Sequence, residues 1–369
     1  MTWTPLPIAM HMANELLSVP VAGATLAIVA VLVAIAAHWA RRATSDDRLP
    51  LMGVMGAFVF AAQMINFTLP GMPGTSGHLG GGVLLAILLG PAAGIVTMAT
   101  ILIVQCLLFQ DGGLLALGCN ILNMGVVPCL FGWVLYRAVL GPAARAAAWR
   151  QYLAAWIACV GGVTAGAAMV PIEAAASGVL QVPLSQFLGV MIGVHLVISL
   201  FEGAITFTAI AYLRRVRPEL MGLEPTGGTA GRYRPGYAAV TASLLITALL
   251  LAGVASWFAS TWPDGLEWSY LKHHFGRAEK AMQNDSPTVA AVEQWQRKLS
   301  PMPDYGRRET PLGEASAEAA GPPAARWPNP NGWRSLAGVL GTIVTLGILY
   351  GVSRWMRRKD FGFYCASEK

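Results

Sequence analysis

Long apolar runs are the feature that most limits what this chain can fold into. Residues Val19–Ala40 and Tyr237–Ser260 form two such runs with few polar side chains. A helix needs about 20 residues, at about 1.5 Å per residue, to cross a hydrocarbon core about 30 Å thick. Because unpaired backbone amides are costly in lipid, a crossing segment of this kind has to be helical. The sequence therefore predicts an all-α integral membrane protein.

The composition supports this class and argues against others. The chain has 369 residues, of which 55% are hydrophobic and only 12% are charged, and its mean hydropathy is +0.55. One soluble core cannot hold that much apolar surface. The net charge of +6 is typical of some nucleic-acid binders, but the basic residues stand in short clusters beside the apolar runs. We therefore expect a lipid bilayer and no nucleic acid as the chain's surroundings.

The apolar runs predict about nine transmembrane helices, seven followed by two. The predicted spans are Val19–Ala40, Pro50–Leu69, Gly77–Gly90, Gly94–Phe109, Leu114–Tyr136, Tyr152–Pro171, Gln186–Tyr212, Tyr237–Ser260 and Leu336–Tyr350.

Basic residues predict the orientation of these spans. The clusters are Arg41 with Arg42, Arg137 with Arg145 and Arg150, Arg214 with Arg215 and Arg217, and Arg354 with Arg357 and Arg358. All fall on one side of the predicted threading, which the positive-inside rule makes cytoplasmic. We therefore expect a multi-pass protein of the bacterial cytoplasmic (inner) membrane, with its amino terminus outside and its carboxyl terminus inside.

The polar segments divide the chain into three parts. Residues 10–217 hold the first seven spans, and residues 218–236 form a cytoplasmic linker with a GGTAG run. Residues 237–369 hold the last two spans, joined by one large extracytoplasmic loop at residues 261–334. A fusion of two once-separate subunits would have this organisation.

Two histidines fall on the predicted external face: His11, and His78 in the glycine-rich loop GTSGHLGGG at 74–82. If the mature chain began at Met10, its amine, the His11 amide nitrogen and the His11 imidazole would form fused five- and six-membered chelate rings. His78 would supply a fourth nitrogen, and a square-planar nitrogen set suits Ni(II) or Cu(II) rather than Zn(II). Nine residues precede Met10. The Met10 amine can therefore be a ligand only if the chain starts at Met10 or if Met1 to Ala9 are removed. Otherwise the motif does not form this chelate.

Other polar groups lie inside the predicted spans. His195 and Glu202 are seven residues apart and share one helix face. Ionisable groups within a membrane indicate function by default, and a polar contact that fixes helix packing explains this pair equally well. The five cysteines show no CxxC spacing, and four lie in apolar runs. We predict neither a disulfide nor a thiolate metal site from them.

Taken together, these segments resemble the CbiM or NikM family, the substrate-specific membrane subunits of energy-coupling-factor nickel and cobalt transporters. The motifs that carry the resemblance are MHMANELLS at 10–18, GTSGH at 74–78, ILLGP at 87–91, FQDGGL at 109–114, NILNMGV at 120–126 and the helix from His195 to Glu202. The last two spans and their loop resemble the CbiN or NikN companion subunit. Its motifs are PDGLEW at 263–268, PMPDY at 301–305 and SLAGVLGT at 335–342.

The resemblance implies a metal site and a set of partners. The implied ligands are the amine of Met10, the amide and imidazole of His11, and His78. The implied substrate is Ni²⁺ or Co²⁺, with no organic cofactor, and the implied partners are a coupling transmembrane subunit and a pair of cytoplasmic ATPases. The chain contains no GxxxxGK[ST] motif of its own, so we expect no ATPase activity and no enzyme.

Two other functions fit an apolar chain with histidines. An intramembrane metalloenzyme would require HExxH or a comparable pair of histidines with a base, and the sequence contains none. A membrane metal sensor would require an output domain, and the cytoplasmic tail is too short for one. The choice between nickel and cobalt as the substrate stays open, because the order of metal affinities does not decide selectivity in cells.

Overall fold

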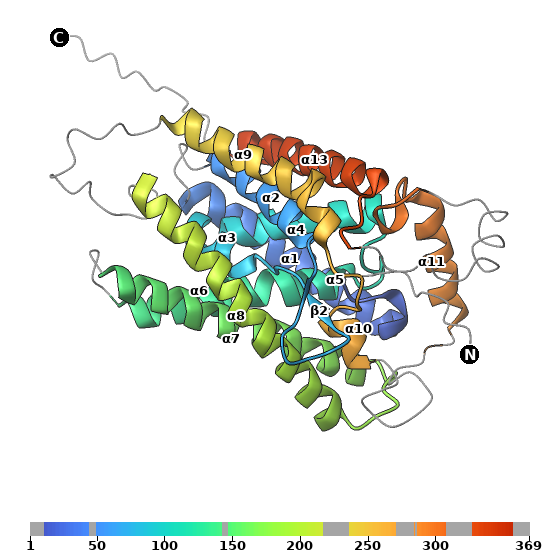
Figure 1. Ribbon diagram of the computed structural model, residues 1–369. Helices are drawn as coiled ribbons and strands as arrows, with labels where there is room; N and C mark the ends of the chain where they lie inside the picture. Colours follow the sequence, from blue (N-terminus) through green and yellow to red (C-terminus); the bar gives the residue numbers. More distant parts are fainter. Residues whose placement is uncertain are drawn as a thin grey trace, which may run out of the picture.

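The computed structural model describes residues 11–43, 49–141, 147–216, 236–270, 284, 286–307 and 327–356. This part of the chain is mostly helical, and its long helices lie side by side along one axis (Figure 1). Six segments are long and apolar enough to cross a membrane. They are α1 (Val19–Ala43), α4 (Pro91–Phe109), the continuous segment from α5 (Leu117–Asn120) to α6 (Val127–Leu140), α7 (Ala148–Ala176), α8 (Leu184–Val216) and α13 (Gly332–Met356).

Two shorter apolar helices, α2 (Leu49–Gln63) and α9 (Tyr237–Gly253), lie in the same bundle. Both pack on α13, which runs along the top of the view in Figure 1. Large apolar side chains remain exposed on the outer faces of the bundle, with Val31 at 60% and Leu250 at 58%. Such faces are stable in lipid and not in water, so the chain is a multi-pass membrane protein.

The short helix α3 (Gly82–Leu89) differs from the span predicted over Gly77–Gly90. All eight of its residues are buried, and eight residues rise only about 12 Å, less than half the thickness of a hydrocarbon core. Glycines in positive-φ conformations, Gly81 at 81° and Gly90 at 87°, mark its two ends. The predicted start at Gly77 was wrong, because the positive φ of Gly81 keeps the helix from beginning before Gly82, whereas the predicted end at Gly90 directly follows the helix.

A π-helical turn, η2 (Ile121–Val126), interrupts the segment between α5 and α6. Pro128 follows it and lacks a backbone N–H, which disturbs the regular α-helical ladder. Helix α7 packs tightly against this turn, because a Cβ atom on Gly166 would lie only 2.0 Å from the carbonyl oxygen of Asn123. The turn thus adjoins the site described below.

One small hairpin departs from the all-α prediction within the described residues. Strands β1 (Phe67–Thr68) and β2 (Ser76–Gly77) pair antiparallel, with Phe67 opposite Gly77 and Thr68 opposite Ser76. The hairpin lies in the loop that leads to α3, directly before His78. It thereby fixes the direction in which the glycine-rich loop enters the bundle.

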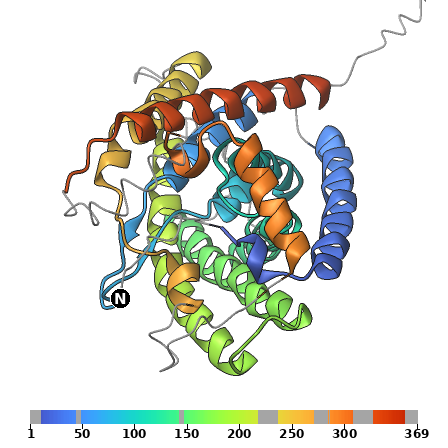
Figure 2. The same cartoon turned by 90° about the vertical axis from the view of Figure 1, so that its right-hand side faces the viewer.

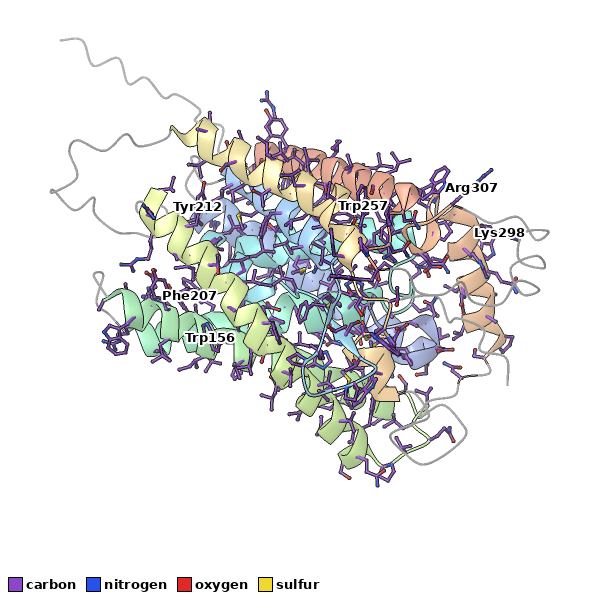
Figure 3. All side chains as sticks on the ribbon, viewed as in Figure 1. Trp156, Phe207, Tyr212, Trp257, Lys298 and Arg307 are labelled. Atoms are coloured by element: carbon purple, nitrogen blue, oxygen red, sulfur yellow. The ribbon has the colours of Figure 1, made fainter. Side chains whose placement is uncertain are left out.

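Short elements cover one end of the bundle. They are η1 (Asn14–Leu16), η4 (Ala255–Phe258), α10 (Gly265–Tyr270), α11 (Pro287–Leu299) and η5 (Pro303–Tyr305). Figure 2 shows α11 lying across this end of the helices. Lys298 and Arg307 lie here, whereas Tyr212 lies at the opposite end (Figure 3). The elements that cover the end come from both halves of the sequence.

Arginines close the opposite end. The Arg41 guanidinium lies 4.8 Å from the centre of the Trp355 ring and links α1 to α13. Arg214 donates a hydrogen bond to Gln151 and links α8 to α7. These residues belong to or adjoin the basic clusters that the sequence placed on one side of the membrane.

Candidate metal centre

The segment around His11 is held by side-chain amides of the bundle. The Met12 backbone N–H donates to Asn120 Oδ1 at 2.9 Å, and Asn120 Nδ2 donates to the Met12 carbonyl at 3.1 Å. The Gly113 N–H donates to the same carbonyl at 2.9 Å. The side chain of Asn120, the first residue of the NILNMGV motif, therefore anchors the segment that carries His11.

The His11 imidazole is buried and paired on one side only. Its Nδ1 lies 2.7 Å from Asp111 Oδ1, and Asp111 Oδ2 accepts a hydrogen bond from the Tyr305 hydroxyl at 2.5 Å. Burial raises the pKa of the Asp111 carboxyl, but His11 and the two hydrogen bonds outweigh burial, so that its pKa lies below the usual value. Asp111 is therefore a carboxylate at neutral pH.

The other nitrogen of His11, Nε2, is buried and has no hydrogen-bond partner among the described residues. Most buried polar atoms in proteins are paired, so an unpaired one needs a physical reason. An imidazole that gives Nδ1 to a carboxylate and leaves Nε2 open has the form of a metal ligand, because the carboxylate fixes the tautomer and the ring direction.

His78 lies beside His11. The centres of the two rings are 5.7 Å apart and the ring planes are inclined by 46°. Two imidazoles that bind one ion at metal–nitrogen distances of about 2.0–2.1 Å have ring centres no more than roughly 6.5 Å apart. His78 Nδ1 lies 3.1 Å from the Leu79 carbonyl oxygen. The structure thus brings the two histidines singled out in the sequence within reach of one ion.

Glu202 holds the glycine-rich loop that carries His78. Its two carboxylate oxygens accept hydrogen bonds from the Gly80 N–H at 2.8 Å and the Gly81 N–H at 3.0 Å. A Cβ atom on Gly80 would lie 2.9 Å from Glu202 Oε2, so the absence of a side chain permits this contact. Gln63 Nε2 donates to the Gly80 carbonyl at 2.8 Å. Glu202 therefore positions the loop.

A cavity of about 90 Å³ connects the two histidines with the middle of the bundle. This is room for several water molecules or for a partly hydrated ion. Its polar lining residues are His11, His78, Asn120, Asn123, His195, Glu202 and Asp264. His195 Nδ1 lies 2.8 Å from the Met191 carbonyl oxygen. His195 thus shares the cavity with the site, although its role was left open between function and helix packing.

The structure describes only part of the predicted chelate. Met10 lies outside the described residues, so its amine is not placed. The six-membered ring of the predicted chelate closes through His11 Nδ1, the nitrogen that contacts Asp111 here. Within the described residues, no group of three or more His, Cys, Asp or Glu side chains is placed, as it stands, to hold a metal ion. The four described cysteines are unpaired and buried.

Sequence reasoning missed the partners of the histidines. Asp111 and Tyr305 appeared only within motifs, and Gln296 not at all. Gln296 Nε2 donates to the Gly112 carbonyl at 2.8 Å, and its Oε1 accepts from the Leu114 N–H at 2.9 Å. The signal that pointed to Asp111 was its place in FQDGGL, between an apolar run and two glycines.

Comparison with known proteins identifies two family regions. Residues 11–220 match CbiM, described as the cobalt uptake substrate-specific transmembrane region, and residues 238–358 match the PDGLE domain. A putative metal transport protein of Haloquadratum walsbyi is 37% identical over 212 residues, which cover 58% of this chain and 93% of that protein. A putative fused nickel transport protein NikMN of Archaeoglobus fulgidus is 37% identical over 212 residues, covering 58% of this chain and 68% of that protein.

A further relative and a solved structure cover similar parts of the chain. The cobalt transport protein CbiM of Geobacter sulfurreducens is 28% identical over 271 residues, covering 69% of this chain and 75% of that protein. The crystal structure of a truncated transition metal transporter aligns with a TM-score of 0.48 at 28% identity, covering 56% of this chain and 98% of that chain. Because the CbiM match covers residues 11–220, more than half of the chain, the chain belongs to the CbiM family of cobalt uptake substrate-specific transmembrane proteins and carries a CbiN-like PDGLE domain after it.

Proposed function

We propose that this chain is the ion-capturing membrane subunit of an ATP-driven importer of the energy-coupling-factor type, with Ni²⁺ or Co²⁺ as its substrate. The observation that carries the proposal is the pair of imidazoles, His11 and His78, whose ring centres lie 5.7 Å apart at a buried cavity. One of their nitrogens, His11 Nε2, is buried and has no hydrogen-bond partner in the part of the chain that the structure describes. Membership of a cobalt uptake family supports the same substrate class.

The ligands we propose are His11, His78 and, in a mature chain that begins at Met10, the Met10 amine and the His11 amide. Such a chain binds the ion through His11 Nδ1, which must then leave Asp111. A chain with residues before Met10 offers His11 Nε2 instead. An all-nitrogen, square-planar set favours Ni²⁺ over Co²⁺, and we propose nickel as the preferred ion.

The proposed topology has nine crossings, with the amino terminus outside and the carboxyl terminus inside the cytoplasmic membrane. The loop before α3 and α3 itself together make the third crossing. The proposed parts are residues 10–217 for metal binding, 218–236 as a cytoplasmic linker, and 237–369 as the companion domain with its loop at 261–334. Basic residues at one end of the bundle support this orientation.

The proposed mechanism requires partner subunits. The external site removes water from the ion and binds it, and a coupling membrane subunit with two cytoplasmic ATPases then drives the change that releases it inward. This chain does not hydrolyse ATP in this scheme, since its sequence lacks the GxxxxGK[ST] phosphate loop.

The test begins with the purified chain in lipid nanodiscs. Intact-protein mass spectrometry identifies the first residue, and titrations with Ni²⁺ and Co²⁺ follow on the same sample. We expect one ion per chain, and a loss of binding of about 100-fold or more in His11→Ala and His78→Ala, because each removes a direct ligand. Equal binding by both variants and the unmodified chain would reject the site. Removal of Met1 to Ala9 should strengthen binding only if the amine is a ligand.

A further inference from the structure

Asp264, an acidic residue of the PDGLE domain, lies at the two histidines of the CbiM region. Its Oδ2 atom is 3.8 Å from His78 Nε2, and its side chain lines the same cavity as His11 and His78. The residue is only 2% exposed. A buried carboxylate that faces an imidazole across a cavity supplies two of the donor types that divalent transition metals accept.

The backbone around Asp264 is fixed against the loop that carries His78. The Ser76 N–H donates to the Pro263 carbonyl at 2.8 Å, and Ser76 Oγ donates to the Trp262 carbonyl at 2.7 Å. The Glu267 N–H donates to Asp264 Oδ1 at 2.8 Å, at the start of α10. One carboxylate oxygen thus caps the helix, while the other, Oδ2, is the oxygen nearest His78.

Gly265 lets this segment approach α8 closely. A Cβ atom at this position would lie 2.7 Å from Val194 Cγ1 and 2.8 Å from Ile198 Cδ1. Both distances are shorter than any ordinary carbon contact, so a side chain here would push Asp264 away from the site. The order of aspartate and glycine in PDGLEW therefore has a steric reason.

The distance between Asp264 and His78 fits a shared ion. Two atoms bound to one ion at about 2.1 Å are roughly 3.0 Å apart at a right angle and roughly 4.2 Å apart when opposite. The observed 3.8 Å lies within this range and exceeds the length of a hydrogen bond.

The charges around the site also support a role for Asp264 in binding the ion. Imidazoles are neutral ligands, and a divalent ion in a buried site needs compensating negative charge. Asp111, at His11, supplies one carboxylate from the CbiM region. Asp264, at His78, supplies a second from the PDGLE domain. Each of the two family regions thus places an acidic side chain at one of the two histidines.

We propose that Asp264 is an additional, oxygen ligand of the transported ion, beside the nitrogen ligands proposed above, so that the PDGLE domain contributes to the metal site of the CbiM region. This inference rests on the proposed function, because it takes His11 and His78 as the other ligands. The metal affinity of the CbiM region then depends on the docked PDGLE segment, and withdrawal of that segment lowers the affinity.

The test uses the full chain in nanodiscs, freed of metal and titrated with Ni²⁺. Asp264→Asn keeps an oxygen that can cap α10, whereas Asp264→Ala removes the cap as well. Glu293→Gln is the matched control, since it makes the same change from carboxylate to amide at a side chain that is exposed on α11. We expect a loss of affinity of at least about 10-fold for both Asp264 variants and none for the control. The visible absorption spectrum of bound Co²⁺ should also differ between Asp264→Asn and the unmodified chain.

The outcomes separate this inference from the proposed function. If His11→Ala and His78→Ala lose the ion but Asp264→Asn binds like the unmodified chain, the aspartate is no ligand and the proposed function stands. Normal binding by Asp264→Asn with weak binding by Asp264→Ala would assign Asp264 to capping α10 alone. If the histidine variants bind normally, the proposed function fails and the inference with it.

Discussion

At the scale of single residues, the carboxylates do as much as the histidines to define the site. Glu202 uses both of its oxygens on the glycine-rich loop, and Asp111 uses one on His11 and one on Tyr305. In this structure each carboxylate uses both of its oxygens on neighbouring groups of the site. Replacing such a group by its amide keeps the shape and changes the number of acceptors.

Glu202→Gln should disturb the loop that carries His78. The amide keeps one acceptor oxygen and turns an NH₂ group toward a backbone N–H, leaving a buried donor unpaired at a cost of about 1–3 kcal/mol. We expect a lower melting temperature in detergent and Ni²⁺ binding weakened by about 10-fold. Ser199→Ala is the control, because Ser199 lies on the same helix and its hydroxyl donates its hydrogen bond to the Leu196 carbonyl, away from the glycine-rich loop. Unchanged binding in Glu202→Gln would show that the loop needs no such anchor.

The sequence could predict the histidines but not the residues that hold them. His11 and His78 stand in recognisable motifs on the same predicted face. Asp111 is 100 residues from His11, and Tyr305 is 194 residues from Asp111. No periodicity within one segment reports a contact between such distant positions, which depends on how the helices pack.

At the scale of elements, α11 is fastened to the site by one buried side chain. Gln296 is 2% exposed and accepts two hydrogen bonds, from the Leu114 N–H at 2.9 Å and from Asn14 Nδ2 at 3.1 Å. It donates to the Gly112 carbonyl at 2.8 Å and to the Cys106 carbonyl at 3.1 Å. The same amide thus joins α11, η1 and the loop that holds Asp111.

Gln296→Glu should loosen α11. A carboxylate has no donor for the two carbonyl oxygens and repels them, which we expect to cost about 1–3 kcal/mol. Hydrogen exchange in residues 287–299 and 110–116 should become faster, and proteases should cut the external loop sooner. Gln294→Glu is the matched control, since Gln294 is exposed on the same helix. Equal protection in both variants would contradict this role.

Element boundaries were predictable where apolarity alone determines them. Predicted spans such as Val19–Ala40 and Tyr152–Pro171 correspond to α1 and α7; α1 starts at the predicted residue and ends later, and α7 is longer at both ends. The span over Gly77–Gly90 was not predictable as the short helix α3. Its apolar composition is the same whether the backbone is helical or extended, and only the glycine conformations decide.

At the scale of the whole molecule, the two family regions form one packed unit. Helix α13 of the second region packs on α2 and α4 of the first. Glycines make this possible, since a Cβ atom on Gly341 would lie 2.1 Å from Phe60 Cζ, and one on Gly56 would lie 2.1 Å from Leu349 Cδ1. This packing, together with Asp264, Gln296 and Tyr305, attaches the second region to the first through noncovalent contacts.

Cleavage of the chain between the two regions tests this attachment. A protease site placed in the linker and cut after purification should leave the two halves together and Ni²⁺ binding unchanged, because the contacts that join them are noncovalent and buried. Gly341→Leu should separate the cut halves on size-exclusion chromatography, since its side chain would occupy the space of Phe60. Gly347→Leu is the control, as a Cβ atom there meets nothing within 4 Å.

If the halves of the unmodified chain part on cleavage, the proposed linker holds the molecule together. If Gly341→Leu leaves them joined, the helix packing contributes little, and the external contacts of Gln296 and Tyr305 would then have to supply the attachment.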